Sequence, residues 1–67
     1  MNGTVKRIVT DKGFGFILAD DGKEYFFHSS SVMDGRYNAL TEGQKVSFDP
    51  TSSSKGPRAE DVQILRG

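Results

Sequence analysis

The runs Lys12-Gly13-Phe14-Gly15-Phe16-Ile17 and Tyr25-Phe26-Phe27-His28 set aromatic rings at alternate positions of two short β-prone segments. Because alternate side chains of a strand point to opposite faces, the rings of each run line up on one face. The link Ala19-Asp20-Asp21-Gly22 is short enough for a hairpin between the runs. Pairing of the two runs therefore predicts one patch that contains Phe14, Phe16, Phe26 and His28.

The competing interpretation places all these rings in the core of a half-buried sheet. The opposite faces, however, already supply an interior: Ile17, Tyr25, Phe27, Val46, Phe48, Val62 and Ile64. A soluble protein seldom leaves several Phe rings in water without a use, because burial of each ring would stabilise the fold by roughly 1.5–3 kcal/mol. The sequence thus favours an exposed patch on which bases can stack.

Length and composition exclude several classes of site. The 67 residues suffice for one domain, which we expect over 1–67. With no cysteine and one histidine, the chain lacks disulfides and the usual zinc ligands, and we expect no cofactor. The sequence shows neither a membrane-length apolar run nor a signal segment after Met1, so we expect no membrane partner and a cytoplasmic location.

The charge pattern near the rings is basic, although the whole chain is neutral. Nine Lys and Arg balance nine Asp and Glu, so the net charge gives no general attraction to phosphate. Lys6, Arg7 and Lys12 cluster near the aromatic run with only Asp11 against them in the sequence. We expect a basic border to the patch; an ordinary solvated surface is the alternative.

The alternating pattern predicts five short antiparallel strands that close into a small all-β barrel, over 4–10, 14–19, 23–28, 45–49 and 59–65. Ser29-Ser30-Ser31 can cap a single helical turn at the start of a long connection over 29–43. Pro50 is expected to end the fourth strand, followed by a flexible polar loop over 51–57.

The two aromatic runs resemble the ribonucleoprotein-type motifs of the cold shock protein family. The first looks like the family's Lys-Gly-Phe-Gly-Phe motif, and the second resembles its hydrophobic-Phe-hydrophobic-His motif. The resemblance covers essentially the whole chain, including Gly3-Thr4-Val5-Lys6, the run from Leu40 to Phe48, and Lys55-Gly56-Pro57-Arg58-Ala59. It implies a cold shock domain with the barrel of the oligonucleotide/oligosaccharide-binding (OB) type. Such a domain binds single-stranded RNA or DNA and acts as an RNA chaperone or a cold shock-type regulator of transcription or translation.

The resemblance carries the family's stacking positions onto Phe14, Phe16, Phe26 and His28, and its basic positions onto Lys6 and Lys12. Tyr37 corresponds to a further aromatic of the family, and its polar, Gly-flanked segment favours exposure; coverage of the barrel mouth is the alternative. For His28 a structural role also stays open, and Gly13 and Gly15 are expected to serve backbone geometry.

Three positions depart from the family's aromatic residues, and we expect all three on the binding face: Arg7, Ile8 and Ser29. A guanidinium can stack on a base and also pair with phosphate, so Arg7 joins the candidate nucleic-acid-binding residues.

The leading hypothesis is a single-stranded nucleic-acid-binding module. The alternative is a protein-interaction barrel that uses the same aromatic patch and binds nucleic acid weakly. An enzyme is not expected, because the sequence offers no nucleophile with a base, no metal set and no phosphate-cradling loop. The expected partners are single-stranded RNA and DNA. Base preference stays open, and a strand-exchanged dimer is the alternative to a monomer.

Overall fold

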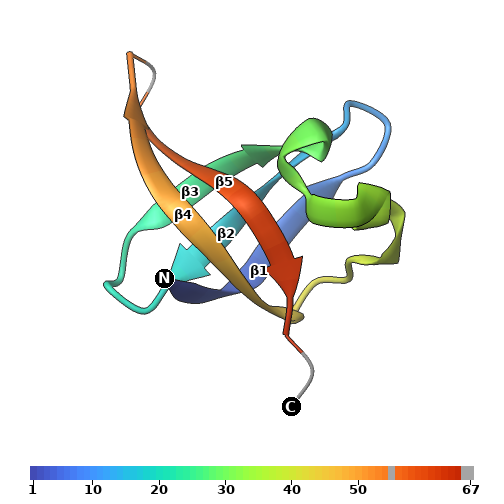
Figure 1. Cartoon of the computed structure of the whole chain (residues 1–67), viewed down its shortest axis with the longest axis horizontal. Helices are drawn as coiled ribbons and strands as arrows, with labels where there is room; N and C mark the ends of the chain where they lie inside the picture. The colour runs from blue at the N-terminus through green and yellow to red at the C-terminus, as the bar shows by residue number, and fades with distance from the viewer. Residues whose placement is uncertain (55, 66–67) are drawn as a thin grey trace.

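Five strands and two 3-10 helices make up the fold in the computed structural model, which describes residues 1–54 and 56–65 (Figure 1). The strands are β1 (Asn2–Val9), β2 (Phe14–Ala19), β3 (Glu24–His28), β4 (Lys45–Ser53) and β5 (Gly56–Ile64). The helices η1 (Ser29–Ser31) and η2 (Met33–Ala39) lie together on one side of the barrel, and they replace the single helical turn expected in the connection from β3 to β4 (Figure 1).

The strands form a closed barrel in the order β1-β2-β3-β5-β4, so the predicted five-stranded barrel of the OB type is confirmed. Neighbouring strands are antiparallel except at the closing contact, where β3 runs parallel to β5 with Phe26 opposite Arg58. Because β1 is antiparallel to both β2 and β4, these two strands run in the same direction. Strand β3 is antiparallel to β2 and β5 is antiparallel to β4, so β3 and β5 must be parallel where they close the barrel. This contact brings the second aromatic run next to the last strand.

The interior is filled by side chains from every strand. Val5, Ile17, Phe27, Val46 and Val62 are fully buried, and the rings of Tyr25 and Phe48 lie 5.1 Å apart between their centroids. The predicted core is confirmed at the buried positions Ile17, Tyr25, Phe27, Val46, Phe48 and Val62. Ile64 is only partly buried and packs against this core. The barrel therefore closes without the rings of Phe14, Phe16 and Phe26.

A β-bulge at Lys6 decides which side chains of β1 face outward. Val5 pairs with Ile17 and Arg7 with Phe16, so β1 holds one extra residue between these pairs. Since paired residues share a face, the bulge turns Arg7 outward and Ile8 inward. Ile8 packs against the core. The expectation that Ile8 lies on the binding face is therefore wrong.

Strand β4 continues through Pro50 to Ser53, so the predicted strand end at Asp49 is wrong. Pro50 pairs with Ala59, and Ser53 pairs with Gly56. The amide of Phe48 donates to the Met1 carbonyl oxygen, and the Phe48 carbonyl oxygen accepts from the Met1 amino group, both at 2.8 Å. The edge of β4 that faces β1 therefore has its last partner at Met1, and Pro50 lies two residues beyond that point. The N–H that proline lacks is not needed there.

The predicted loop over 51–57 is mostly hairpin, with Ser52 opposite Pro57. Lys55 of that loop lies outside the described residues. The hairpin projects from the barrel wall at the side away from η1 and η2 (Figure 1). Ser53, Gly56 and Pro57 of this hairpin line a hollow together with Phe26 and His28 of β3.

Candidate nucleic-acid interface

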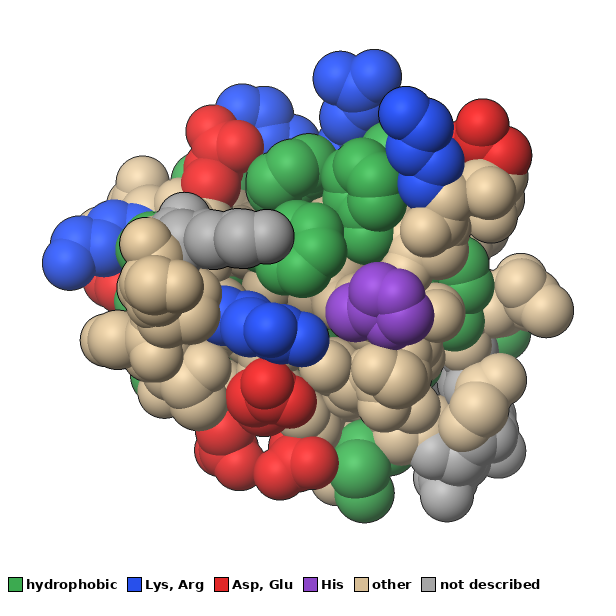
Figure 2. All heavy atoms as spheres, turned by 90° about the horizontal axis from the view of Figure 1, so that it is seen from above, with side chains coloured by type: hydrophobic (Ala, Val, Ile, Leu, Met, Phe, Trp, Pro, Cys, Tyr) green, Lys and Arg blue, Asp and Glu red, His purple; other side chains and the backbone are tan. Residues whose placement is uncertain are grey.

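Three Phe rings from β2 and β3 form one cluster on the outside of the barrel. Ring centroids lie 5.8 Å apart for Phe14 and Phe16, 5.5 Å for Phe14 and Phe26, and 6.0 Å for Phe16 and Phe26. All three rings are partly exposed. The register pairs Phe16 with Phe26 and Phe14 with His28, so the fold brings together all four members of the predicted patch. Figure 2 shows hydrophobic side chains gathered beside the histidine, with Lys and Arg side chains around them.

The glycines of the first run let the outer rings lie directly over the core. A Cβ at Gly15 would lie 2.6 Å from the Arg7 carbonyl oxygen and 2.6 Å from Cζ of Phe27. Gly13 has a φ of 74°, which favours glycine, and it lies in the turn before β2. The expected backbone roles of both glycines are consistent with this geometry. Phe14 and Phe16 can therefore flank Gly15, where β1 and the core ring of Phe27 both approach β2 closely.

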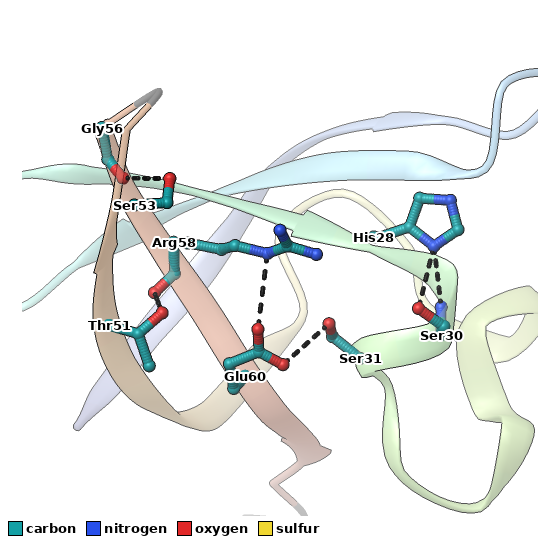
Figure 3. Close-up of polar contacts among 8 residues, drawn as sticks. All are labelled: His28, Ser30, Ser31, Thr51, Ser53, Gly56, Arg58 and Glu60. Atoms are coloured by element: carbon teal, nitrogen blue, oxygen red, sulfur yellow. Dashed lines mark hydrogen bonds and ion pairs between the residues drawn. The ribbon is translucent and has the colours of Figure 1, made fainter.

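His28 ends β3 and caps η1. Its Nδ1 accepts a hydrogen bond from the Ser30 backbone amide at 3.1 Å and lies 3.0 Å from the Ser30 Oγ (Figure 3). Because a backbone amide can only donate, the neutral imidazole carries its proton on Nε2. The side chain is exposed. His28 thus combines the structural role left open by the sequence with an N–H donor available to a ligand.

Arg58 belongs to this surface, although the sequence did not single it out. Its Cζ lies 5.9 Å from the centroid of the Phe26 ring, and its side chain is 38% exposed. Its Nε lies 3.4 Å from Glu60 Oε1, and the other oxygen of Glu60 accepts a hydrogen bond from Ser31 Oγ at 3.2 Å (Figure 3). The pair is too poorly aligned for a hydrogen bond, and the buried Nε has no hydrogen-bond partner among the described residues.

A hollow of about 480 Å³ opens between the ring cluster and the β4–β5 hairpin. Its walls come from β2, β3 and both strands of the hairpin: Phe16, Phe26, His28, Ser53, Gly56, Pro57 and Arg58. The hollow is aromatic on one side and carries a cation on the other. These are the features on which a planar, electron-rich ligand can stack.

The border of the ring cluster at β1 carries both signs of charge. Lys6, Arg7, Phe16, Glu24 and Glu42 line a second hollow of about 390 Å³. Lys6 Nζ lies 3.0 Å from Glu24 Oε2. Pairing of β2 with β3 brings Glu24 to this border, so the expectation of a basic border is wrong here. Lys12 is exposed in the turn before β2.

Comparison with known protein families identifies the chain. The family model described as "'Cold-shock' DNA-binding domain" matches residues 1–65. The chain belongs to the cold shock domain family. The resemblance seen in the two aromatic motifs is thereby confirmed, and the family is described as a DNA-binding domain.

Three relatives of this cold shock domain show how much of the chain is shared. Cold shock protein 1 of Lactiplantibacillus plantarum is 49% identical over 61 residues, which cover 91% of this chain and 92% of that protein. Cold shock-like protein CspB of Bacillus cereus is 47% identical over 65 residues, 97% of this chain and 100% of that protein. Cold shock-like protein CspB of Escherichia coli is 49% identical over 65 residues, 96% and 92% of the two chains.

Tyr37 of this cold shock domain is buried, so the expectation of an exposed ring is wrong. Its side chain is 8% exposed, and its hydroxyl donates to the carbonyl oxygens of Val9 at 3.0 Å and Phe14 at 2.8 Å. Burial raises the pKa of Tyr37, and the charge of Asp11 adds to this effect. Helix η2 carries the ring back over the barrel, where it lies 6.2 Å from the ring of Phe27. Tyr37 therefore holds the backbone of Phe14 through its hydroxyl.

Two further findings bear on the kinds of ligand. No helix within residues 1–54 and 56–65 is long and apolar enough to cross a membrane. In the same part of the chain, His, Asp and Glu side chains form no group of three or more that could hold a metal ion.

Proposed function

We propose that this cold shock domain binds single-stranded RNA and DNA by stacking bases on Phe14, Phe16 and Phe26. One observation carries the proposal: the core is complete without these rings, and they still lie in mutual contact on the outer surface. Partly exposed rings held in contact form a stacking platform. Because every base has a π-face, such a platform accepts bases with little regard to sequence.

The neutral chain fits a function as an RNA chaperone. Stacking contributes roughly 1–3 kcal/mol per base, which is enough to compete with weak base pairing and still allow release. A net charge of zero adds no general attraction to phosphate. We propose that these contacts hold RNA strands open for a short time, and that the same activity underlies a cold shock-type effect on transcription or translation.

The charged residues near the first aromatic run are proposed to contact phosphates: Lys6, Arg7 and Lys12. His28 contributes either a stacking face or its Nε2–H donor. Tyr37 acts on the site indirectly through its hydrogen bond to Phe14. We further propose that the chain acts as a single monomeric domain in the cytoplasm.

The test is a titration of a fluorescently labelled single-stranded pyrimidine oligomer, followed by anisotropy at low and at moderate salt. The chain has no Trp, so the label must be on the oligomer. Replacement of Phe26 by Ala should weaken binding by about fivefold or more, which corresponds to roughly 1 kcal/mol or more. Leu18→Ala is the matched control, since Leu18 is 43% exposed on the same face of β2 but is not a ring.

Folding of each variant is checked by circular dichroism and thermal unfolding. Equal affinity of the folded Phe26→Ala variant and the intact protein would contradict stacking at this ring. No binding by the intact protein at low salt would contradict the proposed function. The protein-interaction barrel would then become the leading alternative.

A further inference from the structure

We infer that the hollow beside Arg58 selects guanine among the bases of a bound strand. This inference rests on the proposed function and adds a base preference to it. It starts from the position of Arg58, whose guanidinium lies over the Phe26 ring at the edge of the ring cluster. A base stacked beside Phe26 would therefore have its edge near this guanidinium.

The burial of Nε determines which part of the Arg58 guanidinium a ligand can reach. Glu60 pairs with Nε, the nitrogen nearest the backbone, and Ser31 in turn donates to Glu60. Figure 3 shows the side chain of Arg58 extending from β5 toward β3, in the direction of His28. Because Nε is buried while the side chain as a whole is 38% exposed and lines the hollow, we take the two terminal nitrogens as the part of the fork that meets a ligand.

The other polar groups around the hollow add a donor rather than an acceptor on the β3 side. The Ser30 amide occupies Nδ1 of His28, so the neutral ring offers Nε2–H. On the hairpin side, the Ser53 hydroxyl donates to the Gly56 carbonyl oxygen at 2.9 Å. A base bound between Phe26, His28 and Arg58 thus meets N–H donors along its edge.

Guanine is the base whose edge fits a fork of donors. Its O6 and N7 are adjacent acceptors, and they take the two N–H groups of one guanidinium together. Adenine places an amino donor beside N7, and that donor would oppose the guanidinium. On the edge that corresponds to O6 and N7 of guanine, cytosine offers only an amino donor and thymine only one carbonyl acceptor. The stacking platform itself tolerates any base, so the preference arises at Arg58 alone.

The test uses a short labelled oligothymidine in which one central nucleotide is replaced by guanine, 7-deazaguanine or adenine. The second base keeps the ring area and O6 of guanine but lacks N7. The intact protein should bind the guanine oligomer about fivefold more tightly than the other two, the low end for a bidentate pair at a partly exposed site. In Arg58→Lys this ratio should fall to about one, because an ammonium keeps the charge without the fork.

Leu18→Ala, which leaves the hollow intact, should keep the guanine preference. Equal binding of the three substituted oligomers by the intact protein would overturn the inference and leave the proposed function standing. A guanine preference that survives in folded Arg58→Lys would also overturn it, since Arg58 would then contact only phosphate. Failure to bind even the unmodified oligothymidine would contradict the proposed function, and the inference would fall with it.

Discussion

The guanidinium of Arg58 lies 5.9 Å from the centroid of the Phe26 ring, across the parallel contact between β3 and β5. This relationship joins the last strand to the second aromatic motif. A cation above an exposed ring contributes about 0.5–1 kcal/mol, so its larger consequence is the position of Arg58 at the edge of the ring cluster. The ring cluster thus has Arg7 at one border and Arg58 at the other, and each border can be tested separately.

Arg7 occupies a position opposite Phe16 where a ring would add to the ring cluster. We predict that Arg7→Trp tightens binding to a single-stranded pyrimidine oligomer and makes it less dependent on salt, because a phosphate contact is exchanged for stacking. Anisotropy titrations at several salt concentrations measure both quantities. Affinity and salt slope that both stay at the values of the intact protein would remove Arg7 from the site.

Glu24 holds Lys6 in an exposed ion pair beside Phe16. We predict that Glu24→Gln strengthens binding at low salt and steepens its salt dependence, because Lys6 becomes available to phosphate without competition. The free energy of unfolding should change by less than about 1 kcal/mol, as is usual for an exposed pair.

Asp20→Asn is the matched control for Glu24→Gln, since it removes the same charge from the exposed turn after β2. If the two variants gained affinity equally, net charge alone would explain the gain. The ion pair between Lys6 and Glu24 would then have no special part in binding.

Gly15 is expected to be the least replaceable glycine of the ring surface. Its added Cβ would approach both the Arg7 carbonyl oxygen and the Phe27 ring at 2.6 Å, so Gly15→Ala should lower the free energy of unfolding by about 3 kcal/mol. Gly22→Ala is the comparison, because Gly22 has a φ of 84° and no heavy atom within 4 Å of its Cβ position. That variant should cost only about 1 kcal/mol of backbone strain. Urea unfolding of both variants measures the two changes in the free energy of unfolding. Equal losses of stability in the two variants would contradict the close packing at Gly15.

Alkaline pH should destabilise the protein through its tyrosines. Burial raises the pKa of Tyr37, and the hydrogen bond to Asp21 raises the pKa of Tyr25. A raised pKa in the folded state means stability that is complete below the ordinary tyrosine value, near 10, and is lost as the pH rises through the folded value. The free energy of unfolding should therefore fall above about pH 10.

Tyr37→Phe isolates one of these two groups. It should cost about 1 kcal/mol at neutral pH, because the carbonyls of Val9 and Phe14 lose a donor. Above about pH 10 its stability should fall less steeply than that of the intact protein, with Tyr25 accounting for the remaining slope. An unchanged alkaline slope in Tyr37→Phe would contradict the role assigned to burial of this hydroxyl.

The ring cluster could be predicted from the sequence because strand alternation and a short hairpin are local properties. Phe14, Phe16, Phe26 and His28 needed only two adjacent strands to come together. The predicted face of Ile8 is wrong because a bulge at Lys6 reverses the alternation of side chains along β1. Nothing in the local sequence pattern marks a bulge there. One extra residue in β1 was enough to exchange the faces of Arg7 and Ile8.

The wrong predictions at Tyr37 and Pro50 and the omission of Arg58 have a common origin in tertiary structure. The polar sequence around Tyr37 indicates a surface segment, but η2 buries the ring and brings its hydroxyl to the carbonyl oxygen of Phe14. A proline ends a strand only where its missing N–H would have paired with a neighbouring strand. Whether Pro50 has such a neighbour depends on where β1 begins. Arg58 joins the site through the parallel closure of the barrel, which no neighbouring residues in the sequence reveal.

The most direct test of binding at the ring cluster is to record the backbone amide shifts by NMR as unlabelled oligothymidine is added to the labelled protein. We predict that the largest changes fall on Phe14–Ala19, Glu24–His28 and the first half of β5 around Arg58. Little change should appear where β1 meets β4, at Asn2–Thr4 and Lys45–Ser47. Shifts centred on that contact or on η2, with the ring strands unchanged at saturation, would contradict binding of single strands at the ring cluster.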